Sequence, residues 1–195
     1  YTNDFIELYN PTASAVPLTG WSVQYASSAG TTWQKTDLGG SIPAGAHYLV
    51  QEGQGAGGTT PLPAPDATGT IAMSASAGKV ALLNSSTAIT SGTSCPTAAS
   101  VDFVGYGAAN CFEGTGAAPG LTNTTADLRA ASGADTDNNS ADFAAGAPNP
   151  RNSGAPPSLS INDVSMNEGD SGTTSFTFTV SLSSPAGAGG VTFDI

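Results

Sequence analysis

Oxygen-bearing side chains alternate in one short polar segment of the chain, at Asp135, Asp137 and Asn139. Carboxylate and amide oxygens spaced in this way can converge on one hard cation such as calcium. The segment is not an EF-hand, because it has no Gly at the sixth position and Gly146 replaces the Glu expected at the twelfth. The segment is therefore either an Asx-turn loop whose side chains bond their own backbone or a calcium site of another kind, with Asp135, Asp137 and Asn139 as the candidate ligands.

The chain has two cysteines, Cys95 and Cys111, which could form a disulfide bond. In a chain that is poor in lysine and rich in Thr, Ser and Gly, a disulfide fits better than a metal-binding pair. Closing a loop of this length contributes about 3 kcal/mol on the chain-entropy model. The alternative is two unrelated buried thiols.

Catalytic groups are hard to assemble from this sequence. Glu7 and Asp102 lie within strand patterns and could form an acid–base pair, but such carboxylates more often accept hydrogen bonds at the end of a sheet. His47 is the single histidine, so no zinc site of ordinary composition can form, and its strand position favours a solvent-facing side chain. No serine lies in a Gly-x-Ser-x-Gly motif. The sequence predicts a protein that is not an enzyme.

Composition limits the partners of the chain. The formal net charge is −11, and the 195 residues include four Lys plus Arg. A nucleic-acid backbone needs a basic face, so nucleic acid is excluded as a partner, and an anionic membrane surface is disfavoured for the same reason. No apolar run of about 20 residues could span a bilayer. We expect an extracellular protein, secreted or attached to a cell surface, with divalent cations as its natural counter-ions.

Short strands separated by turn signals must position these residues. Trp21, Val23 and Tyr25 alternate with polar residues, which is the period of a half-buried strand, and no segment has the 3.6-residue period of a long helix. Strands at this spacing predict an all-β immunoglobulin-like β-sandwich. The expected strands are residues 5–9, 21–25, 32–34, 48–51, 70–73, 80–83 and 100–104.

The chain divides at a segment rich in Pro and Gly, residues 146–157, which we interpret as a linker overlapping the end of a first domain, 1–153. In the second unit, 158–195, Phe176 and Phe178 begin an apolar alternation that resumes after a turn and ends at Ile195. This unit is far shorter than the roughly 100 residues of a complete sandwich. Its missing strands must come from further along the polypeptide or from another chain by edge pairing.

Several segments of the first domain form a recognisable series. They are FIELYNPT (5–12), LTGWSVQY (18–25), PDATG (65–69), GKVAL (78–82), DFVGYG (102–107) and FEG (112–114), with DTDNN (135–139) in the closing part. By the order and spacing of these segments the domain resembles the lamin-tail domain of secreted bacterial proteins. The resemblance covers residues 1–153 and implies an immunoglobulin-like sandwich. Relatives carry a strand before the first of these segments, so the first strand of the domain is expected to be missing and one sheet edge to be open.

The second unit resembles the start of a Calx-beta domain. The matching segments are LSINDVSMNEG (159–169), TSFTFTVSLS (174–183) and VTFD (191–194). The resemblance implies a second, incomplete β-sandwich of Calx-beta type in residues 158–195. It also implies Glu168 as a further calcium ligand.

Together these features predict non-catalytic modules of a large secreted or surface-attached bacterial protein with a structural, adhesive or assembly role. Neighbouring domains or copies of the same chain would pair through open sheet edges and could build a filament, with calcium as a stiffening ion. The alternative is an accessory module of a secreted endonuclease or phosphatase whose catalytic domain lies outside this chain. A sugar-binding face of Trp21, Trp33 and Tyr25 is a third possibility, although strand positions favour these aromatics as core residues.

Overall fold

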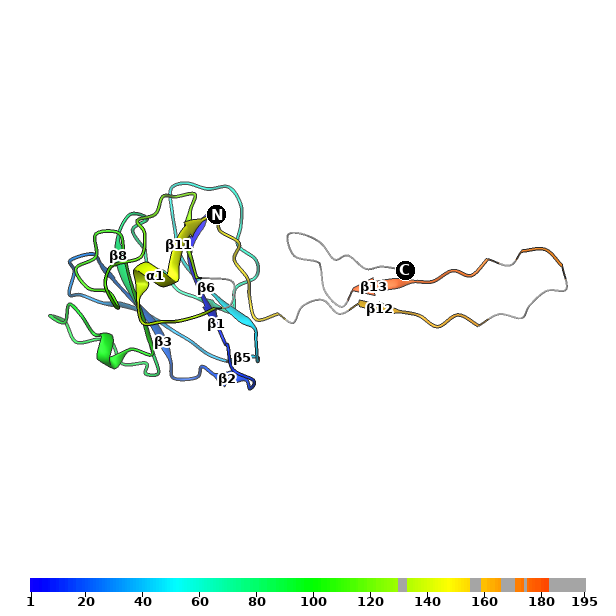
Figure 1. The fold of residues 1–195 in the computed structure, drawn as a ribbon, viewed down its shortest axis with the longest axis horizontal. Helices are drawn as coiled ribbons and strands as arrows, with labels where there is room; N and C mark the ends of the chain where they lie inside the picture. The colour runs from blue at the N-terminus through cyan, green and yellow to red at the C-terminus, as the bar shows by residue number, and fades with distance from the viewer. Residues whose placement is uncertain (130–132, 155–158, 166–170, 174, 183–195) are drawn as a thin grey trace. The chain divides into compact units, whose positions relative to one another are not determined.

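The computed structural model describes residues 1–129, 133–154, 159–165, 171–173 and 175–182 (Figure 1). It divides into two compact units, Tyr1–Ser153 and Gly154–Ile195, which are described separately. Strands dominate both units. The helices among the described residues are the single-turn α1 (Asn139–Asp142) and the 3₁₀ turn η1 (Thr97–Ala99), as the lack of helical periodicity predicts.

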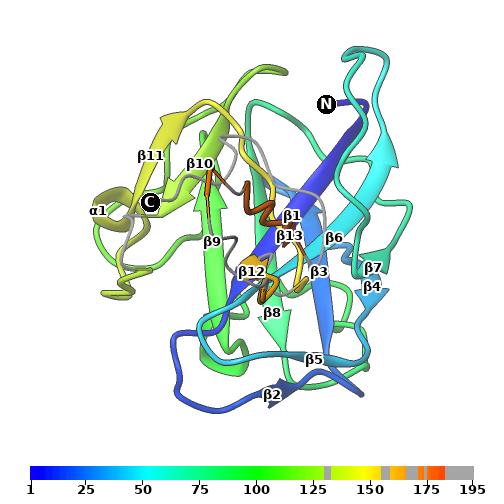
Figure 2. The same cartoon turned by 90° about the vertical axis from the view of Figure 1, so that its right-hand side faces the viewer.

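A four-stranded antiparallel sheet forms one layer of the first unit, in the order β4-β3-β8-β9 (Figure 2). Its central strands are β3 (Ser22–Ser27) and β8 (Gly78–Leu83). Successive side chains of each strand point to opposite faces of the sheet. The edge strands are β4 (Gln34–Asp37) and β9 (Asp102–Tyr106).

A three-stranded sheet in the order β1-β6-β7 forms the other layer. β1 (Asn3–Tyr9) pairs antiparallel with β6 (His47–Gln54), and the short β7 (Ala67–Thr68) pairs parallel with β6. Two small antiparallel pairs complete the unit. They are β2 (Val16–Pro17) with β5 (Ser41–Ile42), and β10 (Ala126–Arg129) with β11 (Phe143–Gly146).

The hydrophobic core lies between the two sheets. Val23 of β3 packs in one cluster with Tyr48 and Val50 of β6, and Ile6 and Leu8 of β1 cover its edge. Because these residues come from both sheets, their burial closes the sandwich and confirms the immunoglobulin-like all-β fold expected from the sequence.

The opposite face of the four-stranded sheet is also buried, beneath a segment that we call the cover loop (residues 84–100). Gln24 of β3 is fully buried on this face. Its side-chain amide donates to the carbonyl of Thr87 at 2.9 Å and accepts the N–H of Ile89 at 2.9 Å. The indole of Trp33 likewise donates to the carbonyl of Thr93 at 2.8 Å. These polar side chains hold the cover loop against the sheet.

The strand predictions are correct for most of the sheets but fail at residues 70–73, which form no strand. The N–H of Ile71 donates to a carboxylate oxygen of Glu52, while the carbonyl of Ile71 accepts the N–H of Gly53. A side chain therefore replaces one ladder hydrogen bond. The strand expected at 32–34 begins later, at Gln34. The short pairs β2–β5 and β10–β11, strand β7 and helix α1 were not expected, because two to four residues carry too little periodicity to be detected.

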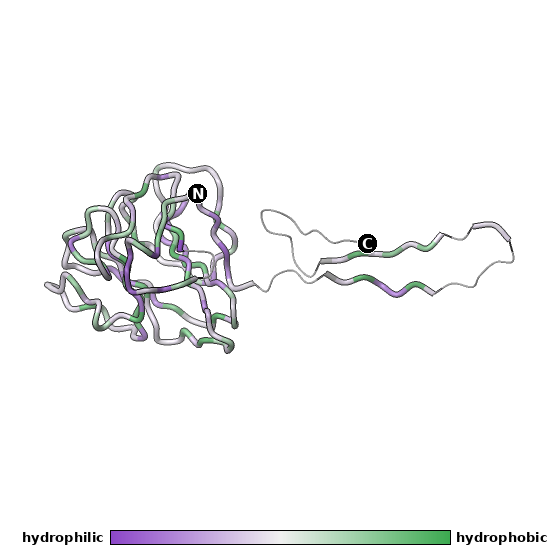
Figure 3. The backbone as a smooth tube through the Cα atoms, in the orientation of Figure 1, coloured by the Kyte–Doolittle hydropathy of each residue, from purple (hydrophilic) through white to green (hydrophobic). Residues whose placement is uncertain are grey.

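The second unit contains one described antiparallel pair, β12 (Leu159–Ile161) with β13 (Val180–Leu182). The strand predicted from Phe176 to Leu182 is formed only at its end, Val180–Leu182. The side chains of Ile161, Phe176, Phe178 and Val180 are exposed. Figure 3 shows the hydropathy of the residues along this pair of segments. The strand expected at 191–195 and the predicted ligand Glu168 lie outside the described residues.

Candidate functional site

Arg129, the last residue of β10, is surrounded by carboxylates. Its guanidinium donates two hydrogen bonds of 2.7 Å to the two oxygens of Asp102 on β9. It also lies 3.0 Å from Asp135 and 3.4 Å from Asp142, and it stacks 4.4 Å from the ring centre of Phe143. One terminal nitrogen bonds both oxygens of Asp102 while the other faces Asp135 and Asp142, and a planar guanidinium suits this divided and stacked arrangement, which a lysine could not reproduce. Arg129 therefore joins β9 to the closing part of the unit.

Three carboxylates gather beside this arginine. Oxygens of Asp102, Glu113 and Asp135 all lie within 4.8 Å of one another. Burial, together with the nearby charges of Asp102 and Asp135, raises the pKa of Glu113 to about 7, against a hydrogen bond from Asn139. Burial also raises the pKa of Asp102, although Arg129 opposes this effect. Such a group of oxygens suits a cation, and the guanidinium already supplies one positive charge.

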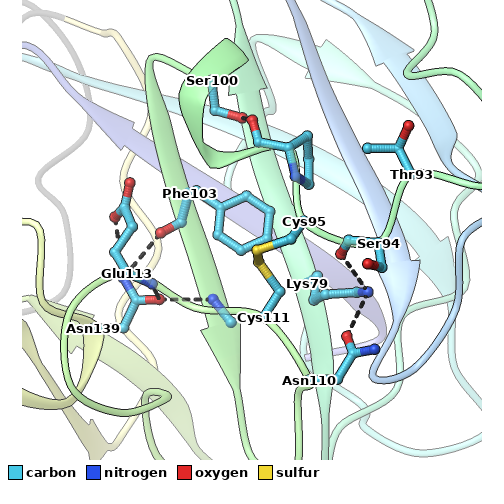
Figure 4. The surroundings of a disulfide bond; sticks show 12 residues. Lys79, Thr93, Ser94, Cys95, Ser100, Phe103, Asn110, Cys111, Glu113 and Asn139 are labelled. Carbon is cyan, nitrogen blue, oxygen red and sulfur yellow. Dashed lines mark hydrogen bonds between the residues drawn. A yellow bond between two sulfur atoms is a disulfide. The ribbon is translucent and has the colours of Figure 1, made fainter.

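Asn139, in the first turn of α1, binds the free edge of β9 (Figure 4). Its fully buried carboxamide donates to the carbonyl of Phe103 at 2.9 Å and accepts the N–H of Gly105 at 2.8 Å. The same oxygen accepts the N–H of Glu113 at 3.1 Å. A single side chain therefore makes the paired hydrogen bonds that a neighbouring strand would make.

The loop before α1 is held by Asp142. Its carboxylate accepts hydrogen bonds from the N–H and hydroxyl of Thr136, at 2.9 and 2.6 Å, and from the N–H of Asn138 at 3.3 Å. Burial opposes ionisation, but these hydrogen bonds and Arg129 lower the pKa of Asp142. Asp137 adopts a positive φ of 53°, and its N–H donates to Asp135 at 3.2 Å. The segment is thus stabilised by side chains that bond its own backbone.

The three predicted calcium ligands occupy different surroundings. Asp135 joins Asp102 and Glu113, whereas the oxygen of Asn139 faces the backbone of β9, and Asp137 is exposed. Calcium binding stays a prediction. Sequence reasoning missed Glu113, Arg129 and Asp142. The composition could have pointed to Arg129. The chain has four basic residues and 15 acidic ones, so each basic side chain has several candidate acidic partners.

Glu7 lies apart from this cluster and does not form a dyad with Asp102. It accepts hydrogen bonds from the Arg151 guanidinium at 2.7 Å and backbone N–H at 2.6 Å, and Nδ1 of His47 lies 3.0 Å away. Burial lowers the pKa of His47, while the charge of Glu7 opposes that shift. His47 is half-buried rather than solvent-facing. Ser153 donates to Asp66, so the end of the unit binds near β7 as well as β1.

The disulfide between Cys95 and Cys111 is present, with the two Cα atoms 5.4 Å apart. It links the cover loop to the segment after β9. Cys111 packs with Trp33 and Phe103 in a core cluster, while Cys95 is exposed. Trp33 and Tyr25 are buried, as expected of core residues rather than a sugar-binding face.

The fold and its buried polar contacts define an immunoglobulin-like β-sandwich module. The family model of the Lamin Tail Domain matches residues 1–108, and the chain belongs to this family. Lamin tail domains are non-enzymatic modules. No curated protein sequence matches the chain. Within the described residues, no helix has both the length and the apolar character needed to cross a membrane.

Proposed function

We propose that this chain is a non-catalytic structural part of a larger secreted or surface-attached bacterial protein and that copies of it associate through strand β1. The disulfide supports an extracellular setting, because such bonds persist in oxidising compartments. The strongest support for association is the state of the sheet edges. An unprotected edge strand presents N–H and C=O groups to which another chain can pair.

Three of the four edges are protected or short. Asn139 covers β9 by bonding the Gly105 N–H and the Phe103 carbonyl, and the Ala118 N–H donates to the carbonyl of Gly105 at 2.8 Å. The β4 edge has four residues and carries the Lys35–Asp37 ion pair, with a 2.5 Å separation. β7 has two residues. Charged side chains and short length are the usual means of keeping an edge from pairing.

β1 is the longest of the four edges, with seven residues, and its carboxylates are engaged within the unit, since Asp4 accepts the N–H of Met73 and Glu7 pairs with Arg151. The backbone N–H of Asn10 donates to the carbonyl of Ala46 and continues the β1–β6 register. Ile6 and Leu8 lie at alternate positions from Asn10 along the strand, so their backbone groups also face β6. The groups of Phe5, Glu7 and Tyr9 must then face away, because successive residues alternate in direction. Within the described part of the chain no hydrogen bond to these outward groups is found. β1 could therefore accept a strand from a second copy.

A charge at this edge tests the proposal. We expect the full chain to form oligomers whose size rises with concentration in sedimentation velocity, and Tyr9→Lys to remain monomeric. Leu128→Lys is the matched control, because Tyr9 and Leu128 are both 40% exposed. A monomer at every concentration, or equal effects of the two substitutions, would contradict pairing at β1.

Calcium belongs to this proposal as a stiffening ion for the closing segment. Asp102, Glu113 and Asp135 would supply hard oxygen ligands, although Arg129 already binds two of these carboxylates. Thermal unfolding with calcium and with a chelator tests the idea, and a higher midpoint with calcium supports it. Identical midpoints would remove calcium from the proposal without affecting association at β1.

A further inference from the structure

Lys79, at the centre of the four-stranded sheet, is fully buried and has no carboxylate partner among the described residues. Its ammonium donates to the carbonyls of Gly30 at 2.8 Å and Ser94 at 2.9 Å, and to the side-chain oxygen of Asn110 at 2.9 Å (Figure 4). An ammonium has three donors, and three acceptors satisfy them here. The ring of Trp33 lies 5.6 Å from the nitrogen, within the range of a cation–π contact.

Two of these acceptors stand directly before the cysteines. Ser94 precedes Cys95 in the cover loop, and Asn110 precedes Cys111 after β9. Both segments also have backbone anchors: the Gly92 N–H of the cover loop donates to the carbonyl of Thr31 at 3.1 Å, and the Asn110 N–H donates to the carbonyl of Ser28 at 2.9 Å. The ammonium therefore holds the two cysteine-bearing segments to one point of the sheet through contacts that do not involve sulfur.

We propose that Lys79 is a positioning residue for the Cys95–Cys111 disulfide and that it brings the two thiols together in the folded, reduced chain. This role is independent of association at β1. Burial lowers the pKa of Lys79, yet three oxygen acceptors favour the charged form that performs this task. A buried ammonium that lost these acceptors would be strongly destabilised, so the two segments are drawn to it as the sheet forms.

The exchange with a disulfide oxidant such as oxidised glutathione follows from the exposure of the two sulfurs. The exposed Cys95 thiolate attacks the oxidant, forms a mixed disulfide and releases one glutathione thiol. The Cys111 thiolate, 3% exposed in the folded unit, then attacks the Cys95 sulfur and releases the second glutathione. Two protein thiols are oxidised, one glutathione disulfide is reduced to two thiols, and the two protein protons leave with them. Lys79 acts in the second step by holding Cys111 near Cys95.

The effective concentration of the two thiols is the quantity to measure. The full chain, Lys79→Met and the control Lys35→Met are equilibrated in glutathione buffers of varied ratio, and mass spectrometry gives the oxidised fraction. We expect Lys79→Met to lower the effective concentration at least tenfold under native conditions and Lys35→Met to leave it unchanged. In strong denaturant all three chains should give the same value, because the ammonium acts only in the folded state.

Asn110→Ala provides a second test should Lys79→Met fail to fold. Asn110 is exposed, so its substitution removes the contact beside Cys111 while leaving the sheet intact. We expect a several-fold fall in effective concentration with unchanged circular dichroism. A folded Lys79→Met or Asn110→Ala chain that oxidises at the wild-type glutathione ratio would overturn the proposal.

Discussion

Asn139 replaces a neighbouring strand along part of β9, so its loss should cost more than that of an ordinary asparagine. Asn139→Ala leaves the Phe103 carbonyl and the Gly105 N–H without partners beneath the closing segment. Each unsatisfied buried group costs about 1–3 kcal/mol, so we expect unfolding free energy to fall by about 3 kcal/mol in denaturant titration. Asn138→Ala is the adjacent control, because its hydrogen bonds to Thr115 and Ser140 are exposed. Equal losses for the two variants would show that Asn139 has no special role.

Raised carboxylate pKa values give the stability an uncommon pH dependence. Burial raises the pKa of Glu113 to about 7 and that of Asp127 to about 6. A group whose pKa is raised by folding holds its proton more tightly in the folded chain. Its contribution is complete below its ordinary pKa and is lost as pH rises through the raised value. We expect the melting temperature to fall between about pH 5 and pH 8.

Variants separate the groups responsible for this trend. Glu113→Gln and Asp127→Asn should each flatten the profile, because they remove a group that deprotonates in this interval. His47 works in the opposite direction: burial lowers its pKa, so its contribution is lost as pH falls. His47→Gln should therefore steepen the profile. A melting temperature that rises from pH 5 to pH 8 in all chains would refute the assignment.

At the scale of elements, Gln24 bonds the cover loop at two points, Thr87 and Ile89. The Gln24 amide also donates to the Ser22 hydroxyl at 3.0 Å. The hydrogen bonds of this side chain are therefore made to other residues of the folded unit. We expect Gln24→Leu to raise hydrogen exchange at residues 85–89 while strands β3 and β8 remain protected. Gln34→Leu, an exposed glutamine on β4, is the matched control. Unchanged exchange in Gln24→Leu would mean that the disulfide and Trp33 hold the loop without it.

The comparison of sequence with structure also belongs to this scale. Strands β1, β3, β6, β8 and β9 were predicted from short apolar runs bounded by turn signals, with clear alternation in β3. β10, β11 and α1 were not, since they are short and rich in Ala, Gly, Asp and Asn. Asn139 illustrates the limit for the site. Its oxygen was recognised as a ligand atom, but its partners Phe103 and Gly105 lie more than 30 residues away, and no local pattern reports a contact of that range.

At the scale of the whole molecule, the folded unit extends beyond the family match. The match ends at residue 108, whereas the compact unit ends at Ser153 and includes Asn139, Arg129 and Arg151 as contacts to both sheets. We expect residues 1–153 to unfold cooperatively on their own and residues 1–108 to aggregate, because removing 109–153 exposes the β9 edge and breaks the disulfide. Size-exclusion chromatography of the two fragments distinguishes these outcomes. A monomeric, folded 1–108 fragment would show that the closing segment is dispensable.

Because all four basic side chains are engaged in contacts, the chain should resist trypsin-like proteases over most of its length. Trypsin-like enzymes cleave after Lys or Arg, and this chain offers them four such positions. Lys79 is buried, while the side chains of Arg129 and Lys35 are 18% and 27% exposed within their ion pairs. Arg151 is 57% exposed beside the boundary between the two units. Limited digestion should therefore cut first after Arg151 and release the sandwich intact, whereas thermolysin, which needs no basic residue, would not be restricted in this way.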